Sequence, residues 1–251
     1  MMELFSEFSL MQWVILMLGA VLIGINKTAI PGLGVLPVLM LTMTFETRMS
    51  TGLQLGMLAL ADLIAVAYYR RSADWKILLK LLPWALIGIA IGSLLLRYVI
   101  PDNSAAMRKT VGIVVLALAI FGYLRRRFAP DKLPDSLGMT SFFGIMLGTT
   151  TQIANAAGPI SSVYLLAMKL PKEKYLGCCA WFFLTLNWIK LPIFAMEGRI
   201  TWQSIQMDLC MIPFLLAGGA AGIFLLRKMP QKLFENIIQA LVFIAAIKLL
   251  F

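Results

Sequence analysis

Residues 24–34 read GINKTAIPGLG, a polar and glycine-rich interruption between the apolar runs 9–26 and 33–45. A second interruption, GTTTQIANAAGP at 148–159, separates the runs 138–150 and 156–168. Backbone groups freed by a helix break cannot face lipid, so such breaks must line protein or a watery cavity. The alternative is an exposed turn at the membrane surface with Lys27 reaching to water. Polar breaks in both places favour a shared cavity.

The rest of the 251-residue chain has the composition of a membrane protein. It is 61% hydrophobic and 14% charged, whereas soluble domains are about 45–50% apolar and about 25% charged. At about 20 apolar residues per span, the chain has room for roughly eight to ten membrane segments. Six runs are long enough to span: 50–69, 77–99, 107–124, 175–196, 204–226 and 233–251. We expect an all-α polytopic protein of the cell (inner) membrane, and not a soluble enzyme.

The two halves of the chain correspond to each other when one is shifted by 124 to 130 residues. Glycine, proline and tryptophan then fall on their own kind in the same order, which chance rarely produces. The matched pairs are Gly24 and Gly148, Gly34 and Gly158, Gly52 and Gly177, Trp75 and Trp202, Pro83 and Pro213. We predict an N-terminal repeat at 1–125, a cytoplasmic linker at 126–136 and a C-terminal repeat at 137–251.

The distribution of basic residues predicts how the repeats lie in the membrane. If each broken pair returns to the side it entered from, thirteen basic residues fall on the cytoplasmic side and six on the other. The cytoplasmic clusters are Arg70/Arg71/Lys76, Arg125/Arg126/Arg127/Lys132, Lys169/Lys172/Lys174 and Arg227/Lys228/Lys232. The positive-inside rule favours this arrangement. It predicts two inverted-topology repeats, each a broken helical hairpin plus three spanning helices.

The two breaks supply the groups that we expect to bind a small anion. A helix beginning near Pro31 would point its N-terminal N–H groups at the cavity, beside the ammonium of Lys27. Hydroxyl and amide groups would fix the orientation of the anion, and glycines would let backbone come close. The predicted substrate-binding residues are Asn26, Lys27, Thr28, Gly32, Gly34, Thr150, Thr151, Gln152, Asn155 and Gly158.

Polar residues also interrupt two long apolar runs. Asp62 lies twelve residues into the run that starts at Ser50, and its repeat mate Asn187 is followed by Lys190 on nearly the same helix face. A carboxylate at this depth must pair, face the bundle interior or be protonated. Asp62 therefore has either a structural role, paired with Lys27 or Lys190, or a coupling and gating role shared with Asn187 and Lys190.

Other patterns exclude functions or predict packing. The chain has no histidine, so we expect no transition-metal site and no cofactor. The basic clusters lie between apolar runs and lack the interleaved aromatic residues of a nucleic-acid surface, so we expect no nucleic-acid partner. Gly88-xxx-Gly92 and Gly218-xxx-Gly222 are GxxxG patterns of close helix packing, which either join the two halves or form a homodimer face.

At its two breaks the sequence resembles the sulfite exporter TauE/SafE family, also called the 4-toluene sulfonate uptake permease family. The resemblance is carried by Asn26-Lys27-Thr28, Pro31-Gly32-Leu33-Gly34, Pro37, Ile153-Ala154-Asn155-Ala156-Ala157-Gly158-Pro159 and Ala180-Trp181-Phe182-Phe183. It implies a secondary carrier of small sulfur-containing anions, such as sulfite or organosulfonates. The alternatives are an anion-selective channel through the same pore and a membrane subunit or scaffold of another complex.

Overall fold

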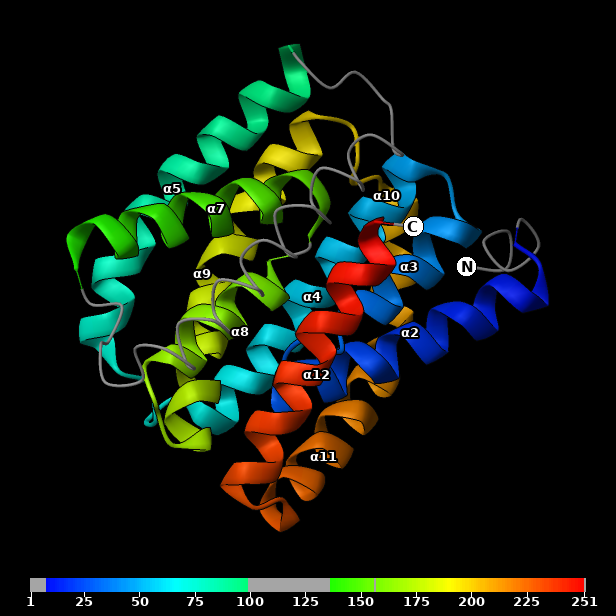
Figure 1. Ribbon diagram of the computed structural model, residues 1–251. Helices are drawn as coiled ribbons and strands as arrows, with labels where there is room; N and C mark the ends of the chain where they lie inside the picture. Colours follow the sequence, from blue (N-terminus) through cyan, green and yellow to red (C-terminus); the bar gives the residue numbers. More distant parts are fainter. Residues whose placement is uncertain (1–7, 99–135, 156, 251) are drawn as a thin grey trace.

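The computed structural model describes residues 8–98, 136–155 and 157–250 of the chain (Figure 1). Its described residues form helices and no strand, which confirms the all-α prediction. The N-terminal helices are α2 (Leu10–Thr28), α3 (Val35–Thr44), α4 (Thr47–Tyr69) and α5 (Trp75–Tyr98). The C-terminal helices are α7 (Leu137–Ala154), α8 (Gly158–Ala167), α9 (Lys172–Met196), α10 (Trp202–Cys210), α11 (Ile212–Lys228) and α12 (Gln231–Leu250).

Four of these helices, α2, α4, α5 and α9, are long and apolar enough to cross a membrane. The predicted spans 50–69, 77–99 and 175–196 are therefore confirmed, while 107–124 lies outside the described residues. The predicted span at 204–226 is found as a bent pair, because α10 and α11 together are long and apolar enough to cross a membrane and meet at a bend of 46°. Pro213 lies in the first turn of α11 and cannot donate the backbone hydrogen bond that would continue α10.

At the centre of the fold, α4 and α9 pack against each other as an antiparallel pair. Asn187 of α9 donates to Asp62 of α4 at the middle of the pair. At one end, a Cβ on Gly52 of α4 would overlap the carbonyl of Arg199, which follows α9. At the other end, Gly177 of α9 lies against Ser72 and Ala73, which follow α4. The residues that touch in the middle are repeat mates, so the two halves meet there symmetrically.

The GxxxG patterns join the two halves inside one chain. Gly88 and Gly92 of α5 lie against α7 near Gly148 and Gln152, and Gly218 and Gly222 of α11 lie against α2 near Gly24 and Thr28. Hydrogen bonds cross both contacts, from Thr149 to the carbonyl of Gly88 (3.1 Å) and from Thr28 to that of Gly219 (3.0 Å). These glycines are buried. These faces are therefore covered by helices of the same chain, which leaves them closed to the alternative, a homodimer contact.

Each broken pair folds back on itself as a hairpin. Phe8, before α2, packs edge-on against Phe45, after α3, at a ring distance of 5.9 Å. Phe143 of α7 packs on Tyr164 of α8 at 5.3 Å. The first hairpin leads into the beginning of α4 and the second into the beginning of α9. Because α4 and α9 are antiparallel, the two hairpins open toward opposite ends of the bundle.

Three of the predicted cytoplasmic basic clusters lie at one end of the bundle. Lys172 donates to the carbonyls of Leu226 (2.8 Å) and Met229 (2.6 Å), which joins the Lys169/Lys172/Lys174 cluster to the Arg227/Lys228/Lys232 cluster. Arg227 donates to Tyr68 at the end of α4, and Trp181 donates to the carbonyl of Arg70. The remaining cluster, Arg125 to Lys132, and most of the predicted linker 126–136 lie outside the described residues. The inverted topology and the repeat boundaries stay predictions for that reason.

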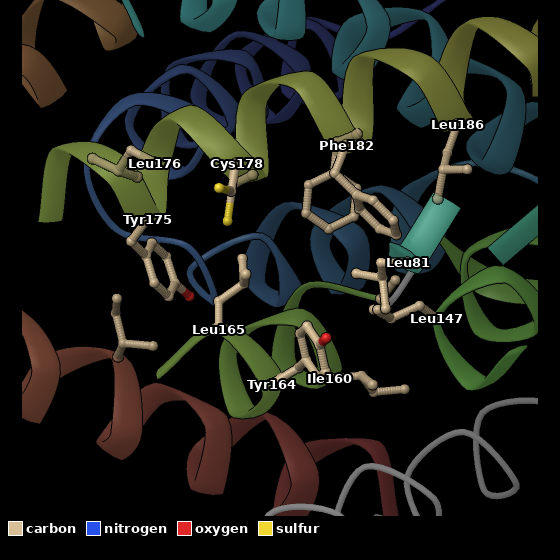
Figure 2. Close-up of a cluster of buried hydrophobic side chains, with 14 of the residues drawn as sticks. Leu81, Leu147, Ile160, Tyr164, Leu165, Tyr175, Leu176, Cys178, Phe182 and Leu186 are labelled. Carbon is tan, nitrogen blue, oxygen red and sulfur yellow. The ribbon is translucent and has the colours of Figure 1, made fainter. Parts of the chain in front are cut away.

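The larger apolar core lies between α9 and the second hairpin. Figure 2 shows Tyr175, Phe182 and Leu186 of α9 pointing toward Ile160, Tyr164 and Leu165 of α8. Tyr175 is buried and its hydroxyl donates to Ser162 at 3.0 Å, so its polar end is satisfied. This packing fixes α9, and with it Asn187 and Lys190, the polar residues of α9 that bond Asp62 and the second break.

Candidate functional site

The first break is a turn closed by Asn26. The side-chain oxygen of Asn26 accepts from the backbone N–H of Gly32 (3.2 Å) and of Gly34 (2.8 Å). Gly32 has φ +108°, a conformation that glycine adopts without strain. Because of this turn the next helix begins at Val35, and the prediction of a helix start near Pro31 is wrong by one turn.

The second break is organised by Asn155 and Lys190. Asn155 ends α7 in the left-handed conformation, with φ 51°, which asparagine tolerates better than most residues. Its amide nitrogen donates to the carbonyl of Thr51 at 3.2 Å. The ammonium of Lys190 donates to Asn155 Oδ1 at 2.6 Å and to Thr151 Oγ1 at 3.0 Å. A lysine of α9 therefore holds the end of α7.

Between the breaks lies a buried ion pair. Lys27 Nζ is 2.6 Å from Asp62 Oδ1, and the amide of Asn187 donates to Asp62 Oδ2 at 2.7 Å. The Lys27 ammonium also lies 4.5 Å from the centre of the Phe183 ring, a cation–π contact. Of the two partners proposed for Asp62 from the sequence, Lys27 is the one that forms the ion pair. This contact contradicts the alternative in which Lys27 reaches to surface water.

A cavity opens where the two breaks face α4 and α9. Its lining includes eight of the predicted site residues: Asn26, Lys27, Gly32, Gly34, Thr151, Asn155, Gly158 and Asn187. The other lining residues are Ile23, Pro31, Pro37, Val38, Gln54, Leu58, Pro159, Cys179, Ala180 and Phe183. Both breaks and both central helices thus contribute to one space, as the sequence predicted.

Five predicted residues lie outside this lining. Asp62 and Lys190 are directly behind it, bonded to residues that line it. The hydroxyl of Thr28 donates to Gly24 and Gly219, and that of Thr150 to Met146 and Leu147, so both serve helix packing. Gln152 is fully buried against Gly92 and has no hydrogen-bond partner for its amide among the described residues.

Sequence reasoning missed Gln54. It lines the cavity, donates to the carbonyl of Val38 at 3.3 Å, and leaves Oε1 without a partner in the described part of the chain. The signal was available, because Gln54, Leu58 and Asp62 recur every four residues and so share one face of α4. The residues 125 positions later, Cys179, Phe183 and Asn187, form the matching face of α9.

The surroundings of the cavity favour negative charge. Two lysines and one aspartate carry formal charge at the site, which leaves one positive charge in excess. Neither α3 nor α8 has a side-chain cap at its first turn, and Gly34, which directly precedes α3, and Gly158, the first residue of α8, line the cavity. Open helix N-termini attract anions through their N–H groups and the helix dipole.

A comparison with protein families finds one covering nearly the whole chain. The family model described as sulfite exporter TauE/SafE matches residues 16–249. No curated protein matches the chain, and no solved structure does. The matched range includes both breaks, both central helices and every residue that lines the cavity.

Proposed function

The chain belongs to the sulfite exporter TauE/SafE family, and on that premise we propose that it is a secondary carrier whose cavity binds one small sulfur-containing anion. Family membership makes it a multi-pass transporter of the cell membrane, of the sulfite and sulfonate exporter type, and not an enzyme. The anion, for which sulfite and small organosulfonates are the candidates, sits between the two hairpin breaks.

The observation that carries the proposal is the environment of Lys190. Its side chain is fully buried, and it forms no ion pair with a carboxylate among the described residues. Its ammonium donates only to the neutral Thr151 and Asn155. An isolated buried charge is expensive in a membrane interior, so a bound anion in the adjacent cavity would stabilise it.

Thr151 transmits this charge to the cavity. Its oxygen accepts from Lys190, which leaves its hydroxyl hydrogen to donate, and no described residue receives it. Hydrogen bonds polarise one another in a low dielectric, so this hydroxyl is a strong donor toward an oxyanion. The side-chain nitrogen of Asn26 and the N-terminus of α8 complete a set of donors without a facing carboxylate.

Alternating access would use the two hairpins as opposing gates. One hairpin is bound to the central pair through Lys27 and Asp62, and the other through Lys190 and Asn155. Asp62 and Asn187 join the two central helices at their repeat-related positions. In this proposal the Asp62 and Lys190 contacts break in turn, so that each hairpin moves while the other stays bound.

The test uses two adjacent threonines that receive the same change. Thr151→Val removes the hydroxyl that faces the cavity, whereas Thr150→Val removes one bonded to its own helix. In proteoliposomes, exchange of radiolabelled sulfite should fall at least about tenfold for Thr151→Val, the loss of about 1.4 kcal/mol. Thr150→Val should exchange within about twofold of the unaltered protein.

Equal exchange by both variants would contradict the assignment of the site. Saturable exchange that is accelerated by anion on the far side favours a carrier, whereas high conductance in planar bilayers would favour the channel. A protein that exchanges neither sulfite nor methanesulfonate would point to the scaffold alternative. Thermal unfolding of both variants in detergent checks that the two valines cost similar stability.

A further inference from the structure

A second buried carboxylate, Asp208, lies outside the cavity. It is near the end of α10, is 5% exposed, and its Oδ1 has no hydrogen-bond partner in the described part of the chain. Asp62, by contrast, has a partner at each oxygen, Lys27 at one and Asn187 at the other. Of these two membrane carboxyl groups, Asp208 alone lacks a charge that would hold it ionised.

The side chain of Asp208 occupies a space that a glycine of α4 leaves open. Gly52 and Gly56 form a further GxxxG face on α4, and a Cβ on Gly56 would overlap Oδ2 of Asp208. The residue of α9 that corresponds to Gly56 is Trp181. Its large indole ring takes the place of the missing side chain and donates to the carbonyl of Arg70. The repeat is therefore broken here, and the small residue on α4 leaves room for the carboxyl group.

In the described part of the chain, no charged group compensates Asp208. On the elements packed against α10 and on the turn before it, none of the ionisable side chains forms an ion pair or hydrogen bond with it. They are Arg48, Asp62, Tyr68 and Tyr69 of α4, Lys27 of α2, Arg227 and Lys228 of α11, Cys210 of α10 itself, and Glu197 and Arg199 of the turn. A lone carboxylate costs several kcal/mol in this environment, and it avoids that cost by binding a proton.

We propose that Asp208 binds the proton that is coupled to anion transport, an inference that rests on the proposed function. The carboxylate takes a proton from water on one side of the membrane, becomes a neutral acid, and returns the proton to the other side. A metal cation is a poor alternative, because no group of three His, Cys, Asp or Glu side chains that could hold one occurs among the described residues.

The coupling has a structural route through α4. One face of α4 contacts Asp208 at Gly56, and another holds Asp62 and lines the cavity. Six residues separate the two positions, about 9 Å along the helix axis. Asp208 also precedes the bend at Met211 by one turn. Ionisation of its carboxyl group would therefore change the contact between α4 and α10 next to the bend between α10 and α11.

The experiment compares Asp208→Asn, which imitates the protonated acid, with Glu173→Gln, which changes an exposed carboxylate at the start of α9. Each is reconstituted into liposomes, and two rates are measured with radiolabelled sulfite: exchange without a pH gradient, and net accumulation under a gradient of either direction. Empty liposomes give the passive background. Exchange tests the proposed function, and gradient-driven accumulation tests the coupling.

We expect Asp208→Asn to keep exchange within about twofold and to lose at least about tenfold of the gradient-driven accumulation, while Glu173→Gln keeps both. A variant that still accumulates sulfite would overturn the proposal, as would an unaltered protein that exchanges sulfite but ignores both gradients. An unaltered protein without exchange would overturn the proposed function instead. If Asp208→Asn loses exchange as well, infrared spectroscopy of both proteins decides. The unaltered protein should show the band of a protonated carboxyl group, and Asp208→Asn should lack it. An unchanged band in Asp208→Asn contradicts the proposal.

Discussion

Lys27 and Lys190 are both buried lysines, but their partners give them different roles. Lys27 is paired with Asp62 at 2.6 Å, so the two side chains form a neutral unit. Lys190 contacts neutral groups, the side chains of Thr151 and Asn155 and the ring of Phe194, and forms no ion pair among the described residues. The anion is therefore expected to respond chiefly to Lys190, whereas the position of Lys27 in the first break predicted that Lys27 would supply the charge. Whether a lysine can attract the anion depends on its burial and on whether a carboxylate neutralises it, and not on its position in a motif.

This difference predicts how the bundle responds when Lys27 is removed. Lys27→Ala leaves Asp62 buried beside Asn187 without its cation, which should destabilise the fold by about 3–5 kcal/mol. Adding Asp62→Asn to Lys27→Ala removes the orphaned charge and should restore part of that loss. The measurement is thermal unfolding in detergent for both single variants and the double variant. Additive losses in the double variant would show that the pair contributes nothing as a unit.

The pairing of residues was partly predictable from the sequence. A carboxylate in an apolar run demands a partner, and Lys27 was one of the two candidates considered. Asp208 was missed because it lies near the start of the predicted run 204–226, close to the polar Gln203 and Gln206, and so did not stand out as a charge within the span. That its carboxyl meets Gly56, about 150 positions earlier, depends on packing of distant helices and has no local signature.

Two helices in the fold share a proline at the same repeat position and respond differently. Pro83 lies inside the continuous α5, whereas Pro213 separates α10 from α11. Proline removes the same backbone hydrogen bond in both places, so the outcome is set by what packs nearby. The sequence predicted that both prolines lie in apolar runs, but it could not predict which run would bend.

Glycine packing between helices gives a prediction with a control on the same helix. Gly148 of α7 lies so close to α5 that a Cβ would overlap the carbonyl of Ala85, while Gly138 of α7 has nothing within 4 Å. Gly148→Ala should force α5 and α7 apart and cost about 1–3 kcal/mol. Gly138→Ala should be neutral or stabilise by up to about 1 kcal/mol, because alanine favours a helix.

Unfolding in detergent, followed by circular dichroism, compares the two alanine variants directly. An equal effect of both would contradict close contact between α5 and α7. The GxxxG patterns predicted close packing from the sequence, and the structure shows that the partner is the other half of the same chain. The pattern alone could not choose between an internal contact and a dimer, because both bring backbones equally close.

For the molecule as a whole, the sequence predicted the helical hairpins, while the inverted topology and the repeat boundaries stay predictions. The hairpin form of each broken pair is confirmed by the contacts of Phe8 with Phe45 and of Phe143 with Tyr164. Three basic clusters meet at one end, as the charge rule required. The run 9–26 was not counted among the spanning runs, but it forms α2, whose 19 residues are long and apolar enough to cross a membrane.

The adjacent cysteines Cys178 and Cys179 allow the movement of the whole molecule to be tested. Cys179 lines the cavity, whereas Cys178 faces away and accepts from the backbone N–H of Asp74 at 3.3 Å. A chain that keeps only Cys179 is made by Cys178→Ala with Cys210→Ala, and one that keeps only Cys178 by Cys179→Ala with Cys210→Ala. These are matched probes, because one thiol reaches the transport path and its neighbour does not.

If hairpins alternate around a single site, a membrane-impermeant maleimide should label Cys179 from either side of the membrane and should leave Cys178 unlabelled. Methanesulfonate, which does not react with maleimides, should slow the labelling of Cys179 severalfold from both sides, because a bound anion occupies the same cavity. Lys190→Met should abolish this protection, since it removes the buried charge that the anion neutralises. Labelling of Cys179 from one side only, or protection that survives Lys190→Met, would contradict a carrier with its anion site between the two breaks.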